Sequence, residues 1–291
     1  MSREQLGLAV ALAILVAPCG SCTGGTGSQR FSFAARVRGT APSTAGEYRF
    51  VNEKGWHITL TRATVTLGPV YLNVIPPLRD AEASVWDLVI RPAWAHGEMH
   101  LGAGRIVGEV LSQVTFDALS NESTPFPTNG TVTQEQVRTA EVWFFPEPGT
   151  PADATKLATI ALDIAGSAQR DGELVKFRGL LKLDDSWTSD QNAGSRGNQS
   201  ITDIRKVRGI GADLFPSEGG VLELGFDVRR LLRGADFASL SGNKSDADGT
   251  KVLTPGKAGD QVMTNLYQGL HEVDQTYSVR WLLSDVPDVE K

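Results

Sequence analysis

The sequence has 291 residues, of which 41% are hydrophobic and 21% are charged, values typical of a globular protein with a substantial core. Disorder over the whole chain is therefore not the default expectation. The formal net charge is -6, and we identify no cluster of basic residues of the kind that contacts nucleic-acid phosphates, so we expect no nucleic-acid partner.

The N-terminal segment has the features of a bacterial export signal. The apolar run Leu6–Ala17 follows a short polar start, and it is long enough for a signal peptide but too short to span a bilayer. Cys19 and Cys22 follow at once. A lipoprotein signal peptidase needs a small residue before the lipidated cysteine. Ser21 precedes Cys22, whereas Pro18 precedes Cys19, so we predict lipidation at Cys22.

This interpretation divides the chain into a lipoprotein-type signal peptide (1–22), a flexible tether (23–29), a single β-sandwich domain (30–285) and a C-terminal tail (286–291). It places the mature protein in the bacterial periplasm or at the outer membrane, attached to the membrane through its N-terminal lipid. The alternative is ordinary secretion, in which both cysteines are incidental and cleavage occurs at a different site.

The mature chain begins with a predicted strand. Apolar residues occupy the odd positions from 31 to 37, which is the period of two expected for a strand with one buried face. A second alternating run begins at Trp56 and changes parity at Arg62, which predicts a bulge or a bend between sheets. Gly68-Pro69 ends that run, and the alternation resumes from 70 to 74.

Residues 158–183 predict a hairpin. Two alternating runs flank Asp171-Gly172, a dipeptide that favours a tight turn. Further strands are expected at 142–145 and 222–228.

Few segments show helical spacing, and the clearest are 108–119 and 229–240. Long loops are predicted at 76–83 and 184–199. Many strands separated by Gly, Pro, Asn and Asp, with little helix between them, predict an all-β fold. We expect an antiparallel β-sandwich with long loops and one or two short helices.

A histidine pair is the sharpest functional candidate in the sequence. On an extended strand, alternate residues of Trp94-Ala95-His96-Gly97-Glu98-Met99-His100 project from one face, about 6 to 7 Å apart in successive pairs. Imidazole nitrogens suit copper and zinc, and a bend at Gly97 would bring in the Met99 thioether. His57 is the first candidate for a third ligand and His271 the second. The predicted metal ligands are therefore His96, His100, His57, Met99 and His271, with copper as the preferred ion and zinc as an alternative.

The same four histidines can also be interpreted without a metal, as exposed, hydrogen-bonded or structural residues. Acidic stretches at 184–192 and 246–249 offer the oxygen ligands that calcium takes, but neither reproduces an EF-hand loop, and we interpret both as solvated turns. The sequence contains no GxSxG, phosphate-binding loop or dinucleotide fingerprint. Hydrolase, kinase and dehydrogenase functions therefore lack support, and we expect no catalytic activity. An enzyme of another type would require convergent polar groups in a pocket, which the sequence does not reveal.

The C-terminal third carries a resemblance to a known family. A strand ending near Asp227 leads into a short amphipathic turn that reaches Phe237, residues 258–270 follow, and Tyr277-Ser278-Val279-Arg280-Trp281 closes this part. With the strand from 56 to 72, this order resembles the MbnP-like family of methanobactin-associated periplasmic copper-binding proteins, over about half of the chain. The resemblance implies a periplasmic β-sandwich that binds copper through histidines. In some relatives the copper lies beside an oxidised tryptophan produced by a partner haem peroxidase.

These observations support two functional hypotheses. In the first, the protein is an exported, lipid-anchored, copper-binding protein whose partner is a haem peroxidase or another envelope protein. In the second, it is a structural or interaction β-sandwich that binds another envelope protein or a glycan. An exposed aromatic patch around Trp187 is the contact surface expected for this second function.

Overall fold

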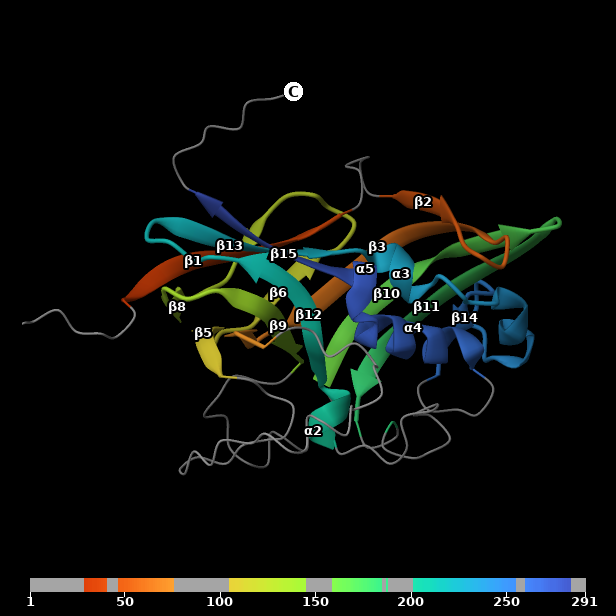
Figure 1. The fold of residues 1–291 in the computed structure, drawn as a ribbon. Coiled ribbons are helices and arrows are strands. Elements are labelled where there is room, and N and C mark those ends of the chain that lie inside the picture. The colour runs from red at the N-terminus through yellow and green to blue at the C-terminus, as the bar shows by residue number, and fades with distance from the viewer. Residues whose placement is uncertain are drawn as a thin grey trace, which may run out of the picture.

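The computed structural model describes residues 29–40, 47–75, 105–144, 159–184, 187, 201–254 and 260–283, and most of these form β-strands (Figure 1). In chain order the strands are β1 (Arg30–Gly39), β2 (Tyr48–Val51), β3 (His57–Leu67), β4 (Val70–Asn73), β5 (Ile106–Val110), β6 (Val114–Asp117), β7 (Thr124–Pro125), β8 (Gly130–Thr133), β9 (Val137–Trp143), β10 (Thr159–Arg170), β11 (Glu173–Leu183), β12 (Lys206–Leu214), β13 (Gly220–Phe226), β14 (Lys251–Val252) and β15 (Tyr277–Leu283). The helical segments are α2 (Ile201–Ile204), α3 (Val228–Leu231), the 3₁₀ helix η5 (Phe237–Gly242), α4 (Gln261–His271) and α5 (Val273–Thr276).

The strands form two sheets that pack into a sandwich. The first sheet has the order β12-β9-β4-β5-β8-β1-β13-β15, with β7 paired to β1, and its end strands β12 and β15 lie alongside each other. The second sheet has the order β14-β11-β10-β3-β2, with β6 paired to β3. The predicted all-β sandwich is confirmed. Most strand pairs are antiparallel, but β1–β13 and β11–β14 are parallel, so the sheets are mixed.

Strand β3 contains the predicted bulge. Arg62 pairs with Ala165 and Leu60 pairs with Gly166, so Thr61 is the extra residue opposite β10. Ile58 and Leu60 are buried before the bulge, and Ala63, Val65 and Leu67 are buried after it. Because a bulge shifts the side-chain alternation by one position, both halves of this long strand face the same core.

The predicted hairpin is also confirmed. Strands β10 and β11 pair up to Arg170 and Glu173, which leaves Asp171-Gly172 as a two-residue turn. Both turn residues have positive φ, 50° at Asp171 and 84° at Gly172, as a type I′ turn requires. The long strands β10 and β11 lie at the middle of the second sheet, and α4 packs against β11 (Figure 1).

One hydrophobic cluster joins residues of both sheets with those of the helices. Helix α4 buries Val262, Leu266 and Leu270 on one side, and it packs against α3, β11 and β12. This apolar stripe at helical spacing is the reason that α4 lies flat against the sandwich.

The helix predicted at 108–119 is wrong. Val107, Val110 and Val114 are spaced like one face of a helix, but they are buried residues of β5 and β6. The spacing of three and four residues between these buried valines therefore imitated a helical period. The segment 229–240 is helical only in part, because α3 ends at Leu231 and η5 begins at Phe237.

Several predicted segments lie outside the described residues: the signal peptide 1–22, the tether up to residue 28, the loop at 76–83, all of 185–199 except Trp187, and the tail 286–291. In the part of the chain that is described, no helix has the length and apolar character needed to cross a bilayer.

The turn between β10 and β11 gives a test of the fold. Replacing Gly172 by Ala should lower the free energy of unfolding by about 1 kcal/mol, because its φ of 84° disfavours a side chain although the space around it is open. Gly211→Ala is the matched control: this strand position is equally open and has no positive φ. Denaturant unfolding should show a loss for Gly172→Ala and none for Gly211→Ala.

Candidate functional site: an arginine-lined groove between β2 and α3

Helix α3 projects arginines from the core. Val228 and Leu231 are buried, whereas Arg229 is exposed and Arg230 partly exposed between them, and Arg233 is exposed beyond the helix. The side chain of Asp227 caps the helix by accepting a hydrogen bond from the backbone N–H of Arg229 at 3.0 Å. Three arginines, Arg229, Arg230 and Arg233, therefore follow within one short segment.

The turn after β2 is fastened to the end of this helix. The buried Asn52 donates from Nδ2 to the carbonyl oxygens of Leu232 at 3.0 Å and Ala235 at 2.7 Å. Its Oδ1 accepts from the backbone N–H groups of Lys54 and Trp56, which folds the turn. The buried amide thus satisfies its hydrogen bonds on both sides and sets the separation of β2 from α3.

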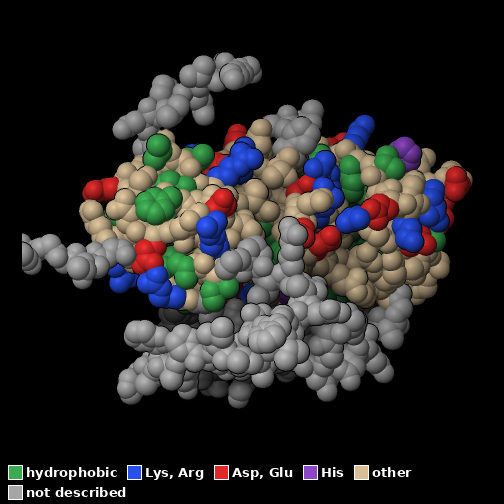
Figure 2. Space-filling model, viewed as in Figure 1, with side chains coloured by type: hydrophobic (Ala, Val, Ile, Leu, Met, Phe, Trp, Pro, Cys, Tyr) green, Lys and Arg blue, Asp and Glu red, His purple; other side chains and the backbone are tan. Residues whose placement is uncertain are grey.

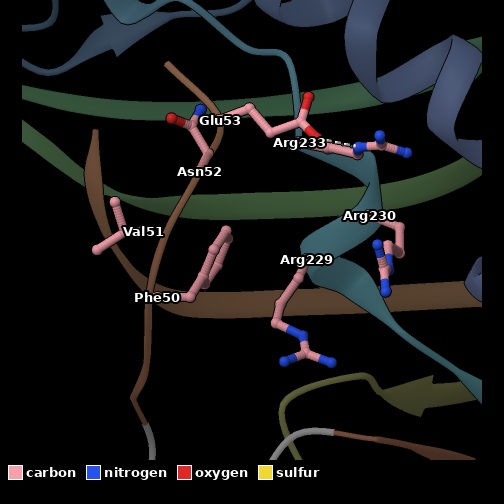
Figure 3. Close-up of a pocket in the computed structure, with 7 residues that line it drawn as sticks. All are labelled: Phe50, Val51, Asn52, Glu53, Arg229, Arg230 and Arg233. Carbon is pink, nitrogen blue, oxygen red and sulfur yellow. Dashed lines mark hydrogen bonds and ion pairs between the residues drawn. The ribbon is translucent and has the colours of Figure 1, made fainter. Parts of the chain in front are cut away.

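A groove lies between these two elements (Figure 3). It has a volume of about 250 Å³ and is lined by Phe50, Val51, Asn52, Glu53, Arg229, Arg230 and Arg233. An adjoining hollow of about 360 Å³ shares Glu53, Arg230 and Arg233 and extends to Gln268 and Glu272. The two hollows therefore meet at these three shared residues.

Two of the arginines are held by carboxylates. Asp227 accepts from Arg229 Nε at 2.9 Å and from its Nη2 at 2.6 Å, and these hydrogen bonds raise the pKa of Arg229. Arg233 Nε donates to Glu53 at 2.6 Å and its Nη1 to Glu272 at 3.2 Å. Both guanidinium groups are fixed in place and stay charged.

Arg230 differs from its neighbours. Its nearest carboxylate oxygen is Oδ2 of Asp227, 3.9 Å from Nε and beyond hydrogen-bond distance, and no hydrogen bond reaches its guanidinium within the described ranges. Its side chain is 32% exposed and lines both hollows. Arg230 therefore keeps its donors available at the centre of the surface.

The ring of Phe50 lines the groove and packs near the buried ring of Tyr48. The rings of Tyr48 and Phe50 lie 5.5 Å apart on β2, and the Arg229 guanidinium lies 6.0 Å from the Tyr48 ring centroid. Burial raises the pKa of the Tyr48 phenol; the nearby Arg229 cation opposes this shift, and Asp227 adds to it. The phenol is therefore a neutral group beside the arginines.

This arrangement suits a single anionic group. A guanidinium presents several N–H donors in a plane and matches a carboxylate or phosphate. Basic and acidic side chains lie close together over this part of the surface (Figure 2), so no broad positive field exists there for a long polyanion. The groove favours one acidic side chain or sugar acid bound at Arg230.

Comparisons with known proteins return no match. No family model, no curated protein and no solved structure matches the chain.

Two of the predicted metal ligands fall within the described residues. His57 is the exposed first residue of β3, paired with Val51 and Gln169. His271 is the buried last residue of α4, and its Nδ1 and Nε2 lie 2.9 Å and 3.0 Å from the carbonyl oxygens of Tyr267 and Ile204. Because a ligand nitrogen must be free of a proton, His271 would have to give up one of these contacts to bind a metal.

The other predicted site residues, His96, Met99, His100 and Cys22, lie outside the described residues. Within the described part, no group of three or more His, Cys, Asp or Glu side chains is placed to hold a metal ion. The described residues alone therefore do not provide a metal centre.

Trp187 does not form the exposed aromatic patch that the sequence suggested. Its side chain is only 1% exposed and stacks on Tyr267, with ring centroids 4.3 Å apart. Its Nε1 donates to the carbonyl oxygen of Lys182 at 2.8 Å. The Trp187 ring instead belongs to the hydrophobic core and fills space beside α4.

Sequence reasoning missed the arginine groove. The spacing Arg-Arg-x-x-Arg after Asp227 was the available signal, because it places three cations directly after a helix-capping residue. The opposite wall comes from Phe50 and Glu53, which are about 180 residues away in the chain. No local pattern reveals a pairing over that separation.

The role of Asp227 can be tested through stability. Asp227→Ala should lower the free energy of unfolding by about 2 kcal/mol, because it removes both the cap of α3 and the partner of Arg229. Asp227→Asn is the matched control, since an asparagine oxygen can still cap the helix and only the ion pair is lost. Chemical denaturation should rank the parent first, Asn second and Ala last; equal stability of the Asn and Ala variants would contradict a capping role.

Proposed function

We propose that the protein is an exported interaction module, and that the groove between β2 and α3 binds an acidic group of another envelope component, either a protein or a glycan. The observation that carries this proposal is Arg230, a partly exposed arginine that lines both hollows and has no hydrogen-bonded partner among the described residues. The N-terminal sequence supports export and attachment to the membrane through Cys22, so the module would act at a bacterial envelope surface.

Preorganisation supports binding at this point. Asn52 fixes the distance between the walls, and Asp227 holds Arg229 beside Arg230. A ligand would therefore meet donors that are already in place, and less entropy is lost when it binds. The paired arginines set the shape of the groove, while Arg230 supplies the charge for the ligand.

We also propose copper binding as a second function, carried by the sequence of the histidine pair. His96 and His100 share one face if their segment is extended, and Met99 lies between them in the chain. The exposed ring of His57 is the better placed of the two remaining histidines, because the ring nitrogens of His271 already contact carbonyl oxygens. The resemblance to the MbnP-like family supports the same function, with a haem peroxidase as the partner.

The groove proposal predicts that binding of acidic probes depends on Arg230. A capped Ala-Glu-Ala peptide and galacturonate, each with one carboxylate, are titrated calorimetrically into the purified protein to test a protein and a glycan source of the acidic group. For whichever probe binds the parent protein, Arg230→Ala should lower the affinity about tenfold or more, because a hydrogen bond to a charged group is lost.

Arg138→Ala is the matched control, since Arg138 is an exposed arginine paired with Asp213 on the first sheet and lines neither hollow. It should bind the probe like the parent. Failure of both probes to bind, or equal affinities of the Arg230→Ala and parent proteins, would contradict the groove as a binding site.

The copper proposal predicts about one copper ion retained per chain after dialysis, measured by elemental analysis. Replacing His96 and His100 together by alanine should remove it, since losing even an outer-shell group usually costs about 10-fold or more in metal affinity. His57→Ala should weaken retention if His57 is the third ligand. Copper retention in the double variant equal to that of the parent would exclude this site.

A further inference from the structure

Strand β2 is an end strand of the second sheet, and the groove runs beside it. In the described part of the chain, β2 pairs only with β3. Its residues Phe50 and Val51 also line the groove that leads to α3. Among the described residues, an unpaired strand edge and an arginine-lined groove thus occupy the same place, where an edge can accept a further strand.

The hydrogen bonds of the β2–β3 hairpin show which backbone groups face outward. The N–H of Asn52 donates to the carbonyl oxygen of Trp56, so this pair is hydrogen-bonded. Hydrogen-bonded and non-hydrogen-bonded pairs alternate along an antiparallel ladder. In the register of β2 and β3, the backbone groups of Tyr48 and Phe50 therefore point to β3, and those of Arg49 and Val51 point to the open edge.

The side chains of β2 alternate between two faces. The Phe50 ring lies on the side of α3, whereas Val51 points away from the helix (Figure 3) and is 55% exposed. A strand added along β2 would follow the same alternation. In the added strand, the residue opposite Phe50 would have its side chain on the groove face, towards Arg229 and Arg230. The two residues next to it in the added strand would have their side chains on the same face as Val51.

We propose that the ligand of the groove is an extended acidic peptide segment of another envelope protein, which adds an antiparallel strand to β2. This inference rests on the proposed function and names its partner. The backbone of the segment bonds to Arg49 and Val51, and a carboxylate opposite Phe50 reaches the arginines. Charge complementarity selects the acidic residue, and the apolar Val51 selects β-branched neighbours on the other face.

The peptide Thr-Val-Glu-Val-Thr, capped at both ends, is the probe for this mode of binding. Its central Glu lies opposite Phe50, and its two valines lie opposite Arg49 and Val51. Changing the Glu to Gln should weaken binding to the parent protein about tenfold, because the charged partner of the arginines is lost. Calorimetry or fluorescence anisotropy measures both affinities.

Backbone methylation separates strand addition from simple charge recognition. N-methylation of the two valines removes the donors that would face β2 and should weaken binding by about tenfold or more. N-methylation of the Glu blocks an N–H that points away from β2, so this matched control should retain affinity within about threefold of the unmodified peptide. The parent protein is used throughout, so folding is not in question.

A variant tests the same edge from the side of the protein. Val51→Pro removes an outward N–H and leaves the β2–β3 ladder intact, whereas Val51→Thr keeps that N–H. Only Val51→Pro should lower the affinity for the peptide, and circular dichroism checks that both variants fold.

The outcomes distinguish strand addition to β2 from the binding of an acidic group in the groove. If methylation of the valines has no more effect than methylation of the Glu, strand addition is wrong, while loss of affinity in Arg230→Ala would still support the groove. If the Glu and Gln peptides bind equally and Arg230→Ala has no effect, the proposed function itself fails.

Discussion

The buried side chain of Asn52 is the contact on which the arrangement of the groove depends. One amide folds the turn after β2 through its oxygen and bonds two carbonyl groups at the end of α3 through its nitrogen. A buried amide has few alternative partners, so the cost of breaking these bonds is high. The turn and the helix therefore move as one unit, and Arg230 keeps its position relative to the open edge of β2.

Charge balance around α3 decides what kind of ligand the groove can accept. Asp227, Glu53 and Glu272 neutralise Arg229 and Arg233 nearly completely, and the protein as a whole is acidic. A long polyanion would meet carboxylates as often as arginines. One carboxylate at Arg230 avoids this repulsion, so the paired residues act as a filter for small acidic groups.

Period-two patterns made most of the fold predictable. The bulge in β3, the Asp171-Gly172 turn and the first strand were read from alternation and turn chemistry, because these features act over a few residues. The helical period was less reliable, since it produced a false helix at 108–119, where valines of β5 and β6 fall at helical spacing. The groove could not be predicted, since Phe50 and Arg230 meet only through the packing of the complete sandwich.

The length of β2 limits what its open edge can recruit. A long flat edge invites indiscriminate pairing and aggregation, but β2 has only four residues and carries the charged Arg49. Two outward-facing residues supply too few hydrogen bonds for tight binding by backbone alone. Additional affinity must then come from a side chain that reaches the arginines. The few backbone hydrogen bonds at the edge and the single ion pair in the groove are therefore both needed for binding. Specificity arises because a partner has to satisfy both at once.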